Sequence, residues 1–254
     1  MDESVGEAQD GEAASCYMCD AAPTSAEHAP PKCLFPEGHR NNLITVPSCD
    51  THNSEKSKDD EYMRFVISSS HASDAEGHKD AFDKALRGMQ YRPHLFKEFF
   101  FKGPTYAATV NGEPTAAYTV DHDRLTNALE HTARAIYFHE FKAKWAEDLW
   151  ILVASGAFSP DEVNAAPQNL RISALASMDP GTPKVGDNPD VFFYQFWTYT
   201  DPSSSILRMV FYAGFVVFAL PRRLMRSLSN AEKGASGVEL RPNLGEHDGA
   251  DQPT

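Results

Sequence analysis

Two pairs of potential metal ligands stand near the start of the chain. Cys16 and Cys19 form a C-x2-C pair, and Cys49 and His52 form a second pair at the same internal spacing. Three thiolates and one imidazole are the kind of ligand set that tetrahedral Zn²⁺ prefers. Cys33, between the two pairs, is the alternative to His52 as fourth ligand. The sequence therefore predicts a structural zinc site in this region.

The position of the cysteines favours metal binding over disulfides. All four lie in the first fifth of the chain, so they could not cross-link the rest of the fold. The N-terminus is acidic and lacks the apolar segment of a signal peptide, and the run Phe211–Leu220 is too short to span a membrane. We therefore expect a cytoplasmic protein that has no membrane partner, in a reducing compartment where clustered thiols bind metal.

A second set of residues is interleaved with the two pairs. Glu27-His28 precede a diproline, Asn42-Leu43 come next, and Asn53 directly follows the second pair. This order resembles the zinc-stapled branch of the HNH endonuclease family, in which an acidic residue and a His precede a proline. In that family an Asn-Leu follows, and a Cys-x2-Cys-Asn leads into a helix. The resemblance covers residues 16 to about 66.

The resemblance implies a ββα-metal fold for this segment. Glu27 and His28 would end the first strand, Leu43–Val46 would form the second, and Asn53 would open a helix that runs to about Ile67. The family usually has a cysteine where His52 stands. Either His52 takes its place as a zinc ligand, or His52 is itself the third histidine of the motif and Asn53 is only its neighbour; the first is more economical.

The same resemblance assigns roles for phosphodiester hydrolysis. Glu27 and Asn53 would hold a catalytic Mg²⁺ or Mn²⁺ through oxygen atoms, and the cation would act as a Lewis acid. His28 would point to the opposite face of the strand from Glu27 and serve as general base, since its ordinary pKa is near neutrality. Asn42 would orient the imidazole ring, with Asn41 as the alternative if the register slips by one residue.

The negative net charge of the chain argues against a nucleic-acid substrate, because it would repel a polyanion. The net charge of the chain is −13, although more than half of the excess lies in residues 1–15 and 228–254. Lys32, Lys56 and Lys58 are candidates for phosphate contacts. Acidic residues flank Lys56 and Lys58, so an equal alternative is that these lysines are solvated at the surface and contact no phosphate.

Local patterns predict ordinary mixed structure beyond the N-terminal segment. A hairpin is expected, with strands at Tyr106–Val110 and Thr115–Val120 around Asn111-Gly112, and Pro114 displaces the start of its second strand. A helix is expected from about Arg124 to Trp145, capped by Asp121 or Asp123. A pair of strands is expected over Val191–Thr200 and Leu207–Leu220. His131 and His139 lie on this helix without H-E-x-x-H spacing and are interpreted as partly exposed helix residues.

Together these observations predict an α+β protein. A zinc-bound ββα-metal (HNH) module over residues 16–68 would precede an α+β domain of unidentified fold over 70–227, with disordered tails at 1–15 and 228–254. The predicted function is a metal-dependent endonuclease that acts on nucleic acid, with DNA as the first choice. The alternative is a non-catalytic zinc-ribbon module that binds nucleic acid or a protein partner. A role of 70–227 in dimerisation or partner binding is left open.

Overall fold

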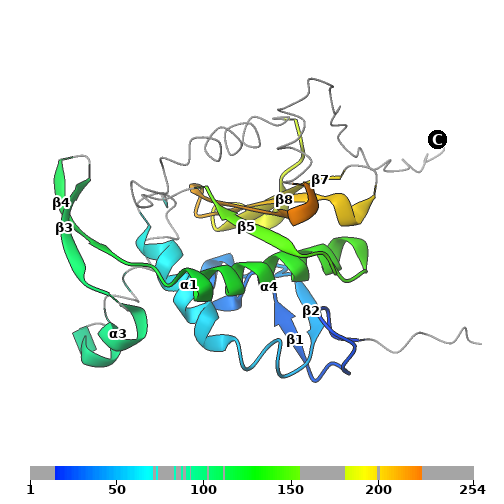
Figure 1. Cartoon of the computed structure of the whole chain (residues 1–254), viewed down its shortest axis with the longest axis horizontal. Coiled ribbons are helices and arrows are strands. Elements are labelled where there is room, and N and C mark those ends of the chain that lie inside the picture. Colours follow the sequence, from blue (N-terminus) through cyan, green and yellow to red (C-terminus); the bar gives the residue numbers. More distant parts are fainter. Residues whose placement is uncertain are drawn as a thin grey trace, which may run out of the picture.

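The structure of the chain is a computed structural model (Figure 1). It describes residues 15–70, 73, 83, 87, 90, 91, 93–101, 103–110, 112–154, 181–198 and 201–224. Mixed helices and strands confirm the predicted α+β class. The two segments predicted to be disordered fall outside the described residues, apart from Ser15.

The N-terminal segment folds as two strands followed by a helix. Strand β1 (Ser25–His28) pairs with antiparallel β2 (Thr45–Ser48), and α1 (Ser57–Ser69) comes next. Two short 3-10 helices, η1 (Lys32–Leu34) and η2 (Glu37–His39), lie between the strands. The first strand ends at His28 as predicted.

The other two boundaries differ from the prediction. Strand β2 begins at Thr45 rather than Leu43, and helix α1 begins at Ser57 rather than Asn53. The helix starts late because residues 51–56 form consecutive turns, the first of which is closed by the backbone N–H of His52 donating to the carbonyl of Cys49 (3.1 Å). These turns, and not the first turn of the helix, carry Asn53.

A second ribbon follows α3 (Pro93–Phe100). Strands β3 (Thr105–Val110) and β4 (Glu113–Tyr118) form a separate two-stranded sheet, which confirms the predicted hairpin. The prediction that Pro114 displaces the second strand was wrong, because Pro114 lies inside β4 opposite Thr109. A two-stranded ribbon consists only of edge strands, where proline is tolerated.

The long helix α4 (His122–Phe141) confirms one of the two predicted caps. The side chain of Asp121 accepts a hydrogen bond from the backbone N–H of Arg124 (3.4 Å). The helix ends before Trp145, because Lys142 adopts a left-handed conformation (φ 53°) that terminates it. Trp145 is nevertheless fully buried in the core.

The C-terminal part forms a five-stranded antiparallel sheet. Its spatial order is β5-β9-β8-β7-β6, made of β5 (Leu149–Val153), β9 (Phe215–Pro221), β8 (Ile206–Phe211), β7 (Phe192–Trp197) and β6 (Val185–Asn188). A short 3-10 helix, η3 (Pro202–Ser204), lies between β7 and β8.

The prediction of one strand over Leu207–Leu220 was wrong. The segment is a tight hairpin in which Tyr212 and Ala213 turn the chain with positive φ angles of 44° and 59°. The run Phe211–Leu220 is apolar apart from Gly214 and contains no Asn-Gly, so hydrophobic periodicity alone does not reveal the turn.

Helix α4 lies between the five-stranded sheet and the β1–β2 ribbon (Figure 1). One buried cluster includes side chains from the N-terminal segment, both long helices and the sheet, among them Tyr17, Met63, Ile136, Tyr194 and Met209. The hydroxyl of Tyr212 donates to the carbonyl of Leu34 (2.5 Å), which ties the sheet to η1. Residues 16–68 therefore share a core with the following residues.

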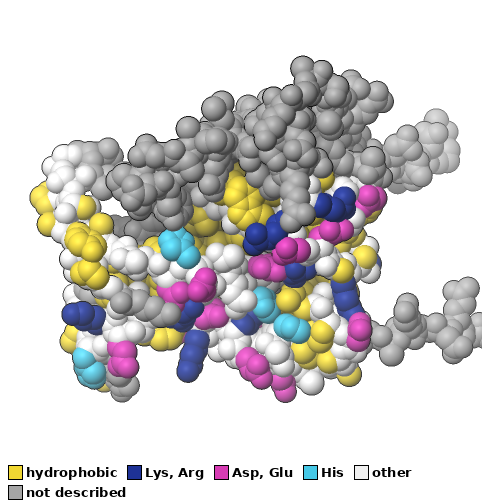
Figure 2. Space-filling view, in the orientation of Figure 1, with side chains coloured by type: hydrophobic (Ala, Val, Ile, Leu, Met, Phe, Trp, Pro, Cys, Tyr) yellow, Lys and Arg dark blue, Asp and Glu magenta, His cyan; other side chains and the backbone are white. Residues whose placement is uncertain are grey.

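The surface carries charges of both signs. On the face drawn in Figure 2, acidic and basic side chains lie interspersed over the described part of the chain. Within that part, none of the helices combines the length and the apolar character needed to cross a membrane.

Candidate functional site

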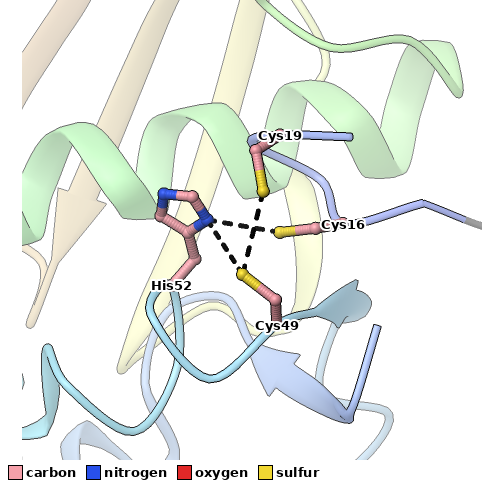
Figure 3. A group of neighbouring side chains, drawn as sticks. All are labelled: Cys16, Cys19, Cys49 and His52. Atoms are coloured by element: carbon pink, nitrogen blue, oxygen red, sulfur yellow. Dashed lines mark hydrogen bonds between the residues drawn. The ribbon is translucent and has the colours of Figure 1, made fainter. Parts of the chain in front are cut away.

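The two predicted ligand pairs meet in one cluster (Figure 3). The ligand atoms of Cys16, Cys19, Cys49 and His52 all lie within 4.8 Å of one another. The Nδ1 atom of His52 lies 3.4 Å from Sγ of Cys16 and 3.3 Å from Sγ of Cys49, and the Sγ atoms of Cys19 and Cys49 are 3.8 Å apart. Tetrahedral zinc with ordinary bond lengths requires about 3.8 Å between two sulfurs and about 3.6 Å between sulfur and nitrogen. The cluster could therefore hold a metal ion such as zinc.

The local backbone explains why the pairs converge. Each ligand pair lies on a short turn, or knuckle: the first carries Cys16 and Cys19, and the second carries Cys49 and His52. The N–H of Cys16 donates to the carbonyl of Ala21 (3.0 Å) and closes the first knuckle, while the N–H of Tyr17 donates to the carbonyl of Pro47 (2.9 Å). The second bond fixes the first knuckle beside β2. Since Cys49 directly follows β2, pairing of the two strands brings both knuckles to the same end of the ribbon.

The electrostatics favour the thiolate, the form that metals bind, at Cys16 but not at Cys19. At Cys19 a hydrogen bond from the backbone of Ala21 lowers the pKa, but desolvation and the neighbouring thiols of Cys49 and Cys16 outweigh it and raise the pKa. Burial by itself raises the pKa of the Cys16 thiol, but hydrogen bonds from neighbouring backbone N–H groups and from His52 outweigh it and lower the pKa to about 6. Cys33 lies outside the cluster, is exposed, and directs its thiol to the carbonyl of Asp60 (3.9 Å). The fourth member is thus His52 and not Cys33.

A buried hydrogen-bonded pair connects the cluster to α4. The hydroxyl of Tyr17 donates to the carbonyl of His52 (3.3 Å) and lies 2.9 Å from Nδ1 of His131. The interpretation of His131 as a partly exposed residue was wrong, because only 9% of it is exposed, while His139 is half-buried. Burial, together with nearby positive charge, lowers the pKa of His131 to about 4 and keeps it neutral. No sequence signal links a tyrosine inside the first knuckle to this histidine.

The residues interleaved with the ligands line a pocket beside the cluster. Its volume is about 260 Å³, and it is formed by the end of β1, η1, the turns before α1 and the first turns of that helix. The lining residues are Ala26, Glu27, His28, Pro31, Lys32, Cys33, Asn53, Ser57 and Asp60. The pocket therefore brings Asn53 together with the adjacent residues Glu27 and His28, from which it is distant in sequence.

Glu27, which lines the pocket, forms a buried ion pair with Lys56. It is 5% exposed, and its Oε1 accepts a hydrogen bond from the Lys56 ammonium (2.7 Å). The same ammonium donates to Oδ2 of Asp60 (2.6 Å). Lys56 therefore fits neither of the two predictions made for it, a phosphate contact or a solvated surface lysine, since only 4% of its side chain is exposed. Burial raises the pKa of Glu27 and of Asp60, although Lys56 acts in the opposite direction on both.

His28 is half-buried, and its surroundings favour the neutral form of the imidazole. Burial, followed by the nearby positive charge of Lys32, lowers the pKa of its imidazole. The neutral ring can then accept a proton. Lys32 and Lys58 are exposed, so of the three candidate phosphate lysines these two face solvent.

The candidate asparagines contact different parts of the chain. The amide of Asn53 donates to Oγ of Ser25 (2.7 Å), which anchors it beside β1. The amide of Asn42 donates to Oδ2 of Asp187 (2.8 Å), and the carbonyl of Asn41 accepts from the Asn188 side chain (2.7 Å). Both Asn41 and Asn42 thus tie the loop before β2 to strand β6, and neither of these bonds reaches His28.

Asp60 also belongs to the pocket and was not among the predicted site residues. Its spacing from Lys56 is one turn of a helix, a signal that could have predicted their ion pair.

Comparison of the chain with protein-family models, with curated proteins and with solved structures finds no match.

Proposed function

We propose that this chain is an HNH-type endonuclease that hydrolyses a phosphodiester in nucleic acid, with DNA as the first substrate to test. The observation that carries the proposal is the shared pocket of Glu27, His28 and Asn53. A carboxylate, an imidazole and an amide in one pocket are the groups that such hydrolysis uses.

Zinc in the Cys3His cluster would have a structural role. Its four ligands would hold the knuckles at the end of the β1–β2 ribbon, next to the turns that carry Asn53. All four positions around the ion are then filled by protein, which is typical of structural and not catalytic zinc.

The pocket residues would divide the chemical work. His28, with its lowered pKa, takes a proton from the attacking water. Glu27 and Asn53 would hold a divalent cation such as Mg²⁺ or Mn²⁺, and Lewis-acid stabilisation of the phosphate charge is what that cation supplies. Lys32, exposed at the edge of the pocket, pairs with the substrate phosphate.

The second candidate is a zinc-bound module that binds nucleic acid or a protein without cutting. The observation in its favour is the Lys56 ammonium, which already neutralises Glu27. A cation at Glu27 must compete with that ion pair, and a chain that had lost catalysis would have no need to release it.

Plasmid cleavage distinguishes the two candidates. The wild-type protein with Mg²⁺ or Mn²⁺ is expected to nick supercoiled plasmid, and His28→Ala is expected to lose that activity. His94→Ala is the matched control, because His94 is an exposed histidine on α3 away from the pocket. Equal inertness of wild type and His28→Ala would favour the non-catalytic module.

A further inference from the structure

The Lys56 ammonium occupies a position that suits a metal ion. It lies 2.7 Å from a carboxylate oxygen of Glu27 and 2.6 Å from one of Asp60. Oxygen ligands lie about 2.0–2.1 Å from Mg²⁺ and about 2.3–2.6 Å from Ca²⁺. The two oxygens thus converge on one cationic centre and need to contract by only about 0.5 Å for a divalent ion.

Asp60 has capacity for a further interaction. Its second oxygen, Oδ1, is buried and has no hydrogen-bond partner among the described residues, although the residue as a whole is 8% exposed. A buried carboxylate oxygen without a partner is costly, and an ion or an ordered water commonly accounts for one. Asp60 also lines the pocket that holds Glu27 and Asn53.

We infer that Glu27 and Asp60 together form a two-carboxylate site for a divalent metal cation, and that the Lys56 ammonium competes with this cation for both carboxylates. The inference rests on the proposed function for the role of the cation, and it adds Asp60 as a ligand and Lys56 as a regulator of affinity. Hard divalent cations select carboxylate oxygens, which supports this ligand pair.

The competition follows from charge. A dication near Glu27 would be repelled by an ammonium in the same low-dielectric region, so Lys56 must leave the carboxylates before the cation can use both. Removal of the ammonium leaves two adjacent buried carboxylates that repel each other. A divalent cation then relieves this repulsion, so it should bind more tightly and stabilise the folded chain.

Mn²⁺ binding to the full-length, zinc-loaded protein tests the inference. Free Mn²⁺ is measured by electron paramagnetic resonance during titration. Lys56→Met replaces the ammonium with an apolar side chain of similar length, and is expected to bind Mn²⁺ at least about tenfold more tightly than wild type. Lys97→Met, an exposed lysine on α3, is the matched control and should bind as wild type does. The double variant Lys56→Met/Asp60→Asn should lose the gain.

Thermal unfolding gives a second readout of the same competition. The melting temperature of Lys56→Met should fall in metal-free buffer and should recover on addition of Mn²⁺, whereas that of wild type should change little. If Lys56→Met does not fold under any condition, Asp60→Asn in the wild-type background decides, since it keeps the Lys56–Glu27 pair. That variant should weaken the low-affinity binding of Mn²⁺ by at least about tenfold.

Two results overturn the inference: Lys56→Met binds Mn²⁺ no more tightly than wild type, or Asp60→Asn leaves binding unchanged. Failure of the nuclease proposal is separable from both. Tight Mn²⁺ binding by Lys56→Met without plasmid cleavage by any variant would support the metal site and refute the nuclease. Cleavage that requires His28, with Mn²⁺ binding indifferent to Lys56 and Asp60, would do the reverse.

Discussion

Replacement of one cysteine in the metal cluster should destabilise the whole chain. Cys49→Ser removes a thiolate that lies 3.3 Å from His52 and 3.8 Å from Cys19 at the end of β2. Cys33→Ser is a matched control, because the same atom is changed at an exposed position outside the cluster. The four cluster residues connect the first knuckle to β2, so a metal bound by them would stabilise the folded state alone.

The size of the effect follows from the number of ligands. Structural zinc contributes roughly 10–16 kcal/mol of apparent binding free energy in small zinc modules, which is about 2.5–4 kcal/mol for each of four ligands. A ligand that binds only the folded chain raises the free energy of unfolding by the same amount that it gains in binding, at fixed free concentration. Cys49→Ser should therefore lower the free energy of unfolding by about 3 kcal/mol, whereas Cys33→Ser should change it by less than about 0.5 kcal/mol.

Urea unfolding in a zinc-buffered solution, followed by tryptophan fluorescence, measures both values. Trp145 is fully buried in the shared core and reports its loss. Elemental analysis should give close to one zinc per wild-type chain, and a strong chelator should lower the stability of wild type further than Cys49→Ser does, because it removes all four metal–ligand bonds and not one. Equal free energies of unfolding for the two serine variants, or a wild-type chain that contains no zinc, would refute the reasoning.

Three further predictions concern the parts that support the site. Tyr17→Phe should lower the free energy of unfolding by about 1–3 kcal/mol in urea titrations, because it leaves the buried Nδ1 of His131 without its partner; a neutral result would mean that water replaces the hydroxyl. Asp121→Ala should cost about 1 kcal/mol by loss of the α4 cap, and Asp121→Asn, which retains an accepting oxygen, should restore most of it. Burial raises the pKa of Tyr118 to about 12. Because its folded-state pKa lies above its ordinary value of about 10, its contribution to stability is complete below pH 10 and is lost as pH rises toward 12. Tyrosinate absorbance of wild type, compared with that of Tyr118→Phe, should therefore assign to Tyr118 an ionisation near pH 12, and an ionisation of Tyr118 near pH 10 would contradict this.

The Cys3His cluster was largely predictable from the sequence. Its ligand types and their repeated spacing identify Cys16, Cys19, Cys49 and His52, since each knuckle closes within a few residues and depends little on the rest of the chain. The alternative ligand Cys33 could be excluded only by its position. Local rules also predicted the cap at Asp121 and the β3–β4 hairpin.

The environment of the pocket could be predicted only in part. Glu27, His28 and Asn53 were identified by their order in the chain, but the ion pair of Glu27 with Lys56 joins residues from a strand and a turn. A lysine among acidic residues resembles a surface lysine in sequence, and its burial depends on how α1 packs against the β1–β2 ribbon. The turn at Tyr212 was missed although Gly214 marks it, because Tyr212 and Ala213 are as apolar as the strands that the turn joins.

What the sequence by itself determined was local: which side chains can bind a metal, where a helix is capped, and where a ribbon turns. What only the tertiary structure decided was which distant groups share a buried environment, as Tyr17 does with His131 and Glu27 does with Lys56. The physical reason is that ligand spacing and capping act over a few residues of backbone geometry. The pairing and charge state of a buried polar group depend instead on the packing of the whole core, which excludes water from around it.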